Sequence, residues 1–316
     1  MRYLCDEPIP VWLDRVEAMA IWVCGEALID KISSGGQLRE IPGGGPANTA
    51  HALARLAIKN EFIGGLSSDA YGQMMREQFI AAGVGLRFTP THDLPTCTAN
   101  VTIAADGSAS YHFIIDGTAT FAYDENSLPP INRDEVDALY FGTLAAIVEP
   151  GASVLFEWMK GAVGKVPIIF DPNIRPTVVG DRERYQASVA RFLEIADVVK
   201  ASSEDIAWLY PEMHEFEVAK SWLAHGVQLV VITRGEKGLV GITADHVIEV
   251  PGIEVDVVDT VGAGDTVGAI LAEGIVTHGL ERALAAELSH ILHRAVQASA
   301  ITCSRQGAQP PYKKEL

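Results

Sequence analysis

The sequence predicts an α/β fold in which helices cover both faces of a mainly parallel sheet and a small second β-sheet forms a lid. Two observations predict the main body: short β-rich runs alternate with longer amphipathic stretches, and 316 residues suffice for one large α/β domain or two smaller ones. A third observation predicts the small sheet, because residues 27–42 and 95–123 interrupt the alternation and lack helical periodicity.

The alternating elements follow one another along the chain without a repeat or a low-complexity linker. Strands are expected at the short runs rich in β-branched and aromatic residues, at residues 21–24, 61–63, 138–141, 167–170, 198–200 and 229–233. Helices are expected at the amphipathic stretches, at residues 47–57, 69–82, 153–163, 184–195, 216–225, 264–278 and 280–299. Strands that alternate with helices in this way form parallel βαβ units.

The two interrupting segments predict a lid made of β-strands. Within the second segment, residues alternate in character over 100–105 and again over 110–115, on either side of Asp106-Gly107. Asp-Gly between two alternating runs is a strong signal for a β-hairpin. A sheet built from pieces distant in the sequence could cover an active site and exclude water from it.

The first twenty residues are expected to form an extension, and residues 21–316 the main domain. The extension carries aspartate, glutamate and proline where a secretory signal needs an apolar stretch, so it does not predict secretion. Because the first expected strand begins near Ile21, translation could also start at Met19.

Composition disfavours several classes of protein. The formal net charge of −17 disfavours a nucleic-acid binder, which would concentrate Lys and Arg. Cys5, Cys24, Cys97 and Cys303 are far apart and form no metal-binding pattern, which favours a reducing cytoplasm. No run approaches the roughly 20 apolar residues that cross a bilayer, so no membrane association is expected.

The segment DTVGAGD at residues 259–265 has the pattern of a strand end, a glycine turn and a helix start. The small residues Gly262, Ala263 and Gly264 let the backbone approach an anion, and free N–H groups with the helix dipole stabilise negative charge there. Asp265 at the edge of this anion hole could accept the proton of an attacking hydroxyl, as phosphoryl transfer requires. Taken alone, the pattern also fits a tight turn in which Asp265 is only an N-cap.

The segment resembles the signature of the ribokinase-like (PfkB) carbohydrate kinases, and further landmarks follow in the family's order over nearly all of the chain after residue 20. The resemblance implies a Rossmann-type α/β domain with a β lid, ATP as donor, Mg²⁺, and transfer to a primary hydroxyl of a sugar. It implies that Asp265 is the catalytic base and that Gly262, Ala263 and Gly264 bind the γ-phosphate. A monovalent cation such as K⁺ is common in the family near this turn, and a homodimer through the lid is a further expectation from the family.

The stretch IPGGGPANTAHALARL implies, by the same resemblance, a substrate site formed by Gly44, Gly45 and Asn48, together with Asp30 in GEALID. Three glycines before a helix allow close approach of a sugar, and the asparagine amide both donates and accepts hydrogen bonds. A buried carboxylate facing vicinal hydroxyls also suits a sugar ligand. A flexible loop with a helix cap is the alternative interpretation of the glycines.

The stretch FDPNIRP follows an expected strand and is similar to the corresponding region of fructokinases and 2-keto-3-deoxygluconate kinases. It places Asp171, Asn173 and Arg175 at the carboxyl end of that strand, where open α/β sheets bind ligands. Arg175 could neutralise phosphate charge in the substrate site, and a surface arginine is the alternative.

Three further stretches, VVKASSEDI, VVITRGEKG and AITCSRQGAQPP, are similar to the family's nucleotide-contacting segments. By that resemblance the nucleotide contacts, beyond Gly262 and Gly264, are Ser202, Thr233, Gly235, Gly307 and Ala308. Asp205 stands where the family usually has a glutamate associated with Mg²⁺, so it is the expected metal residue, acting through water. An ordinary β-turn is the alternative interpretation of VVITRGEKG.

The sequence departs from the family pattern at Ala57 and Ser67, where glycine is common, whereas Asp69 and Gly72 match. We interpret these departures as differences in packing. The leading hypothesis is phosphorylation of fructose, based on GGGPANTA, DPNIRP and DGTA.

Ribose, 2-keto-3-deoxygluconate and a nucleoside are alternative substrates, in falling order. A non-catalytic sugar-sensing protein is disfavoured because Asp265 is intact. A dinucleotide-dependent dehydrogenase is disfavoured because no GxGxxG follows the first strand.

Overall fold

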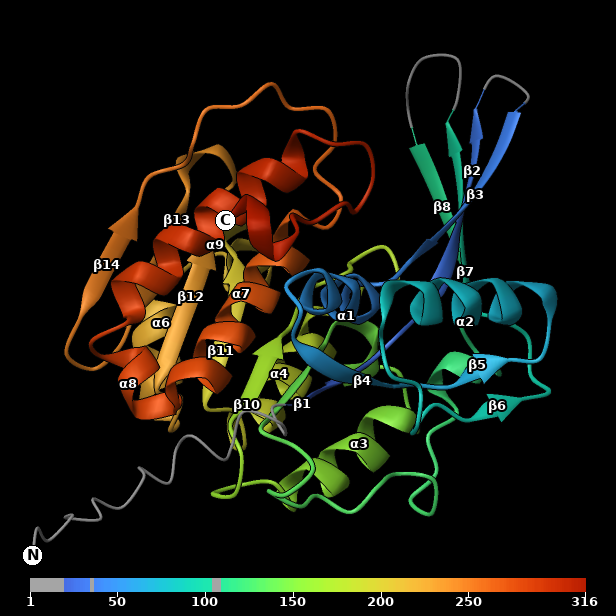
Figure 1. Ribbon diagram of the computed structural model, residues 1–316, viewed down its shortest axis with the longest axis horizontal. Coiled ribbons are helices and arrows are strands. Elements are labelled where there is room, and N and C mark those ends of the chain that lie inside the picture. The colour runs from blue at the N-terminus through green and yellow to red at the C-terminus, as the bar shows by residue number, and fades with distance from the viewer. Residues whose placement is uncertain (1–19, 35–36, 104–108) are drawn as a thin grey trace, which may run out of the picture.

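The computed structural model describes residues 20–34, 37–103 and 109–316 (Figure 1). Its large sheet has eight strands, in the order β14 (Val247–Val250), β13 (Leu239–Ile242), β12 (Leu229–Thr233), β11 (Val198–Ser202), β10 (Ile168–Asp171), β9 (Ala138–Gly142), β1 (Ala20–Cys24) and β4 (Lys59–Ile63). The strands from β12 to β4 pair in parallel, and β13 and β14 add an antiparallel edge. The six expected strands are therefore confirmed. The two edge strands were not expected, because runs of four residues are too short to show a period.

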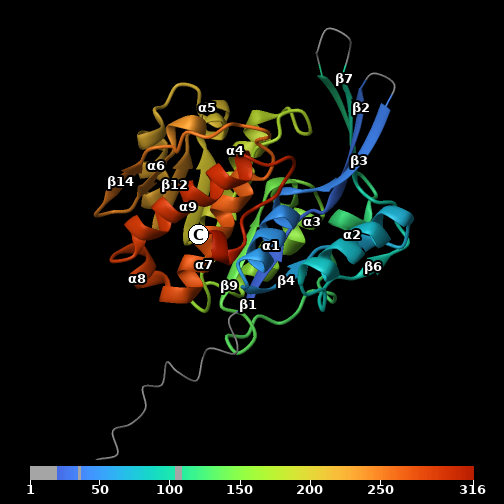
Figure 2. The same ribbon diagram turned by 45° about the horizontal axis from the view of Figure 1, so that its top comes forward.

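Helices cover both faces of this sheet, as Figures 1 and 2 show. One face carries α1 (Gly45–Arg55), α2 (Ala70–Ala82), α7 (Ala263–His278), α8 (Leu280–Leu284) and α9 (Leu288–Cys303), and the other carries α3 (Gly151–Lys160), α4 (Arg182–Leu193), α5 (Ser203–Leu209) and α6 (Glu215–Ala224). The predicted α/β architecture is thus confirmed. The short helix α5 was not expected, since seven residues give little periodicity.

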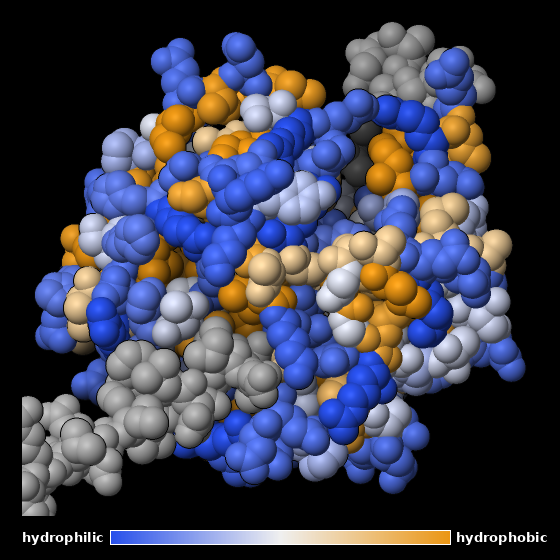
Figure 3. Space-filling view, in the orientation of Figure 1, coloured by the Kyte–Doolittle hydropathy of each residue, from blue (hydrophilic) through white to orange (hydrophobic). Residues whose placement is uncertain are grey.

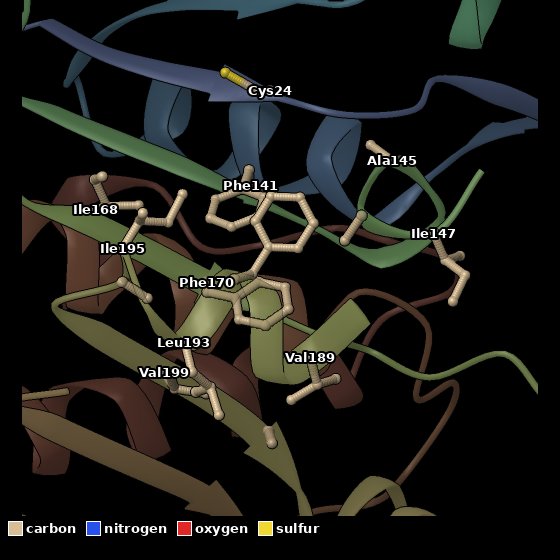
Figure 4. Close-up of a cluster of buried hydrophobic side chains, with 14 of the residues drawn as sticks. Cys24, Phe141, Ala145, Ile147, Ile168, Phe170, Val189, Leu193, Ile195 and Val199 are labelled. Carbon is tan, nitrogen blue, oxygen red and sulfur yellow. The ribbon is translucent and has the colours of Figure 1, made fainter. Parts of the chain in front are cut away.

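Side-chain alternation in the buried strands explains why both faces need helices. In β1, Ile21 and Val23 belong to one apolar cluster, whereas Trp22 and Cys24 belong to the other. Figure 4 shows the second cluster, in which Phe141 of β9 and Phe170 of β10 stack with their ring centroids 4.8 Å apart. Successive residues of one strand therefore bury against different helical layers.

The stretch 280–299 was expected to be one helix, and that expectation is wrong. The chain leaves the helical conformation at Ala285, where φ is −116° and ψ is −92°, and the Arg282 side chain bridges the break to Glu287. The segment contains no glycine or proline to signal a break. Ala283 and Leu288 lie in the same buried cluster on either side of it, so tertiary packing decides the position.

The small sheet has the order β3 (Gln37–Gly43), β2 (Leu28–Ser34), β7 (Thr98–Ile103) and β8 (Ala109–Ile114). Strands β7 and β8 pair antiparallel, which agrees with the expected hairpin, while its turn at Asp106-Gly107 lies outside the described residues. Figures 1 and 2 both show this sheet projecting from the main body beside α1 and α2. A two-stranded ribbon, β5 (Leu66–Ser67) and β6 (Thr91–His92), lies near α2.

The departures at Ala57 and Ser67 have local structural accounts. Ala57 follows α1 with φ at 60°, a left-handed conformation that costs a non-glycine residue roughly 1–2 kcal/mol. Ser67 is buried, and its hydroxyl accepts a hydrogen bond from the Asp69 amide at 3.0 Å. Asp69 in turn caps α2 by accepting from the Gly72 amide at 2.8 Å.

Residues 1–19 lie outside the described residues, so the expected extension and the start at Met19 remain predictions. Within the described part of the chain, no helix combines the length and apolar character that a membrane crossing needs. The thiols of Cys24, Cys97 and Cys303 are free.

Candidate active site

Polar side chains gather at the edge where the parallel strands of the large sheet end. Thr143 follows β9, Asp171 is the last residue of β10, Ser202 ends β11 and Thr233 ends β12. Parallel strands bring their carboxyl ends to one edge, so residues far apart in sequence converge there. This edge is the location that ligands occupy in open α/β sheets.

The glycine turn before α7 presents backbone N–H groups at this edge. Gly262 has φ at 79° and precedes the first helical residue, Ala263. No side chain of the described residues caps this helix end; the Ala263 amide donates to the Thr260 carbonyl oxygen at 3.3 Å, and the N–H groups that follow it at the helix start are the ones that an anion could use. A Cβ at Gly262 would lie 2.7 Å from that of Ala308, which shows how closely the C-terminal segment packs against the turn.

Asp265 lies in the first turn of α7 with 8% of its surface exposed. Its Oδ2 accepts a hydrogen bond from Asn48 Nδ2 at 2.8 Å. The Thr49 hydroxyl reaches the Asp265 carbonyl oxygen at 3.4 Å. Helix α1 therefore holds the expected base at the expected substrate site, across 217 positions of sequence.

Gly45 at the start of α1 lies against three polar side chains. A Cβ there would be 2.9 Å from Thr143 Oγ1, 3.0 Å from Asn173 Nδ2 and 3.3 Å from Asp265 Oδ1. Asn173 Nδ2 donates to Thr143 Oγ1 at 3.2 Å, and both residues have positive φ, at 39° and 55°. Such strained non-glycine residues cluster at functional sites, where surrounding structure holds them. Gly44, directly before Gly45, has φ at 110°.

The electrostatics of the site favour a proton acceptor. Burial raises the pKa of Asp265 to about 6, against the opposing effects of Lys200, the Asn48 hydrogen bond and Arg175. The nearby Asp171 adds to the increase. A carboxylate with this pKa is ionised at neutral pH, yet is a stronger base than an exposed aspartate.

Two further expected substrate residues, Asp30 and Arg175, are coupled electrostatically, and Arg175 also acts on Asp265. Burial raises the pKa of Asp30, on β2, to about 6, and Arg175 opposes the increase. Arg175 is exposed, and its guanidinium donates to the carbonyl oxygen of Ile174 at 3.1 Å. Since Arg175 acts on Asp30, Asp265 and Glu26, its positive charge lies within reach of all three.

The expected nucleotide residues occupy neighbouring positions on this edge. Ser202 and Thr233 are paired in register across β11 and β12, and Gly235 begins the following turn with φ at 56°. Gly307 donates its N–H to Asp259 Oδ2 at 2.9 Å, which ties the C-terminal segment to the glycine turn. The Ser202 hydroxyl caps α5 by accepting from the Asp205 amide at 3.0 Å, so part of its hydrogen-bonding capacity is used locally.

Asp205, the expected metal residue, accepts two backbone hydrogen bonds and so also has a structural role. One carboxylate oxygen accepts from the Ser202 amide at 3.0 Å, the other from the Ile174 amide at 2.8 Å, and the residue is 7% exposed. The carboxylate thus joins α5 to the loop after β10. Among the described residues, no group of three or more His, Cys, Asp or Glu side chains is arranged to hold a metal ion.

Three site residues were not singled out as functional from the sequence: Glu26, Thr143 and Lys200. Glu26 is 1% exposed, and burial raises its pKa to about 7. Lys200 is buried beneath the glycine turn and forms an ion pair with Asp171 at 2.8 Å. A lysine inside an otherwise apolar strand is a signal that could have identified Lys200, and Glu26 stands two residues after the end of the first strand.

A cavity of about 280 Å³ opens between the lid strand β3, helix α1 and the C-terminal segment. Gly43, Asn48 and Ala308 are among the residues that line it. The cavity therefore connects residues expected to bind the acceptor with residues expected to bind the nucleotide.

An anion hole at a helix N-terminus, a buried carboxylate beside it and a projecting β-sheet together define a small-molecule phosphotransferase of the ribokinase type. The family of pfkB carbohydrate kinases matches this chain over residues 18–315. The chain belongs to this family.

Individual relatives are consistent with that assignment. The chain is 36% identical to a fructokinase from Rhizobium leguminosarum bv. trifolii over 254 residues, which cover 79% of this chain and 77% of the relative. A solved fructokinase double mutant from Vibrio cholerae O395, with fructose, ADP and potassium bound, is similar with a TM-score of 0.81 and 26% identity, covering 92% and 94% of the two chains. A fructokinase from Xylella fastidiosa with bound ATP gives a TM-score of 0.83 at 25% identity and covers 94% of each chain.

Proposed function

We propose that the protein is a fructokinase that transfers the γ-phosphoryl group of ATP to a primary hydroxyl of D-fructose. The observation that carries this proposal is the contact between Asn48 and Asp265, which joins an acceptor-binding segment to a base at the anion hole. The fructokinases among its relatives support fructose as the acceptor.

In this reaction Asp265 accepts the proton of the attacking hydroxyl as the new P–O bond forms and the bond to the β-phosphate oxygen breaks. Asn48 orients the carboxylate through the hydrogen bond to Oδ2. The N–H groups in the first turn of α7, beyond the Ala263 amide, would stabilise the charge on the transferred group, because a helix start holds such donors in fixed positions. Asp30 binds sugar hydroxyls, and Arg175 neutralises phosphate charge.

The nucleotide is proposed to lie along Ser202, Thr233 and Gly235, with its base near Gly307 and Ala308. Figure 3 shows hydrophobic residues along the upper rim of the main body, over the loop that follows β14. Val257 and Val258 of this loop are 64% and 60% exposed. Apolar side chains beside an anion hole suit the flat face of an adenine base.

Mg²⁺ is proposed to enter with ATP, since it keeps several waters and binds mainly through phosphate oxygens. Such a metal neutralises charge on the phosphates. The Asp205 carboxylate would take part through water, and each of its oxygens already accepts one backbone hydrogen bond. Chelation by EDTA should abolish turnover, and added Mg²⁺ should restore it.

Potassium is proposed as an activating cation near the glycine turn, where the family resemblance implies a monovalent cation, and a similar fructokinase structure contains potassium. Turnover in K⁺ should exceed turnover in tetramethylammonium at equal ionic strength. Equal rates in the two salts would remove this part of the proposal.

The cytoplasm is proposed as the compartment. It supplies ATP, and the thiols of Cys24 and Cys97 are free, as in a reducing compartment.

The decisive experiment is a panel of acceptors at equal concentration with ATP and Mg²⁺, following ADP release. Fructose should give the highest kcat/KM, ahead of ribose, 2-keto-3-deoxygluconate and nucleosides. Higher kcat/KM with ribose or a nucleoside would overturn the choice of fructose and leave the kinase assignment intact.

A further inference from the structure

A lysine lies buried directly beneath the anion hole. Lys200 belongs to β11, and 4% of its side chain is exposed. Its Nζ donates to Asp171 Oδ2 at 2.8 Å, and the same oxygen accepts from the Tyr140 hydroxyl at 3.1 Å. A Cβ at Gly264 would lie 2.9 Å from Nζ, so the ammonium lies against the backbone that forms the hole.

The surroundings keep this ammonium charged. Burial by itself lowers the pKa of Lys200, but the ion pair with Asp171, together with Asp265 and Asp205, raises it above its ordinary value. A buried charge is costly unless it is paired and hydrogen-bonded. Asp171 is the direct partner of this ammonium, and Asp265 and Asp205 add to the negative field around it.

We infer that Lys200 is a positioning residue for phosphoryl transfer, whose ammonium keeps Asp265 ionised and adds positive charge beneath the anion hole. Asp171 and Tyr140 hold the ammonium in place. This inference rests on the proposed kinase function, since it assigns a role to Lys200 within that same site.

The charges near Asp265 shift its pKa in opposite directions. Lys200 and Arg175 favour its ionised form, whereas Asp171 disfavours it, and Glu26 is a further carboxylate coupled to it. The two members of one ion pair therefore have opposite effects on the base. These opposite effects follow from the opposite signs of the two charges, and they give each variant its own expected direction of shift.

The test compares Lys200→Met with Asp171→Asn, using the pH dependence of kcat/KM with fructose and ATP. Loss of the ammonium should move the acid limb, which reports ionisation of Asp265, to higher pH by about one unit or more. Loss of the Asp171 charge should move it to lower pH. Lys200→Arg keeps the charge and should leave the limb near its original position.

Lys165→Met is the matched control, because this lysine is exposed and lies far from the candidate site. It precedes β10, at the amino ends of the parallel strands, whereas the site lies at their carboxyl ends. Its acid limb should match the wild type. Shifts of Lys200→Met and Asp171→Asn in the same direction, or no shift in either, would overturn the inference. Thermal unfolding of each variant shows whether it is folded, and if Lys200→Met does not fold, Lys200→Gln takes its place in the same measurement.

Failure of the proposed function gives a different result. In that case the wild-type enzyme would turn over none of the acceptors. The pKa of the Asp265 carboxylate would then be followed by carbon-13 NMR titration in the same variants, with the same opposite shifts expected.

Discussion

Replacing Gly45 with alanine should impair catalysis through a single methyl group. The backbone of Gly45 does not have a positive φ, and alanine is favoured over glycine in helices, so the backbone itself tolerates the change. The new Cβ would lie 2.9 Å from Thr143 Oγ1 and 3.0 Å from Asn173 Nδ2. Both distances are roughly half an ångström inside ordinary van der Waals contact.

The same methyl group would lie 3.3 Å from Oδ1 of Asp265, the carboxylate proposed to accept the proton of the acceptor hydroxyl. Overpacking of this kind costs about 1–3 kcal/mol in stability. Displacing a catalytic geometry by as much as 1 Å costs about 10²-fold in rate. We therefore expect kcat/KM for fructose to fall by about 10²-fold, which corresponds to ~2.7 kcal/mol in the transition state.

Steady-state kinetics and thermal unfolding, measured on the same preparations, give the result. Gly180→Ala is the matched control, because its Cβ would meet only the Pro176 carbonyl oxygen, at an ordinary 3.7 Å. That variant should keep wild-type kinetics. Near-normal kcat/KM for Gly45→Ala, or an equal loss in Gly180→Ala, would refute the steric argument.

Three other predictions concern the base and the lid. Asp265→Asn should lower kcat by at least about 10²-fold while calorimetry shows ATP binding retained; near-normal turnover would force another assignment of the base. In the wild type, kcat/KM should fall as the pH is lowered through about 6, because burial raises the pKa of Asp265 to that value and its protonated form cannot accept the hydroxyl proton; a profile flat down to pH 5 would contradict this. We also propose that the lid forms a homodimer, since Leu38 and Ile114 are 58% and 45% exposed there; Leu38→Asp should shift sedimentation from dimer to monomer, and a wild-type monomer at micromolar concentration would rule the dimer out.

The order of the main elements could be predicted because each depends on neighbours in the sequence. Apolar residues recur with the period of a helix or a strand, and these periods follow from local backbone geometry. The break in the stretch 280–299 lacked such a signal. Ala285 leaves the helix because Ala283 and Leu288 both bury in one cluster, which depends on α7 and not on adjacent residues.

The glycine turn could likewise be located from the sequence, since it and Asp265 lie within seven consecutive residues, and the catalytic roles assigned to them stay predictions. The similarity to pfkB kinases extended this prediction to Asn48, and the hydrogen bond between the two side chains agrees with it. The roles of the nucleotide residues, the bound cations and the dimer stay predictions.

By itself, the sequence determined the α/β class, the six main strands and the place of the segment with the proposed base, because each is encoded by residues close together in the chain. Only the tertiary structure decided that Lys200 lies beneath Gly264 and that Thr143 and Asn173 meet beside Gly45. The physical reason is the parallel sheet, which brings the carboxyl ends of separate strands to one edge irrespective of their distance in sequence. Which side chains then touch depends on strand order and helix packing, and neither leaves a local signal.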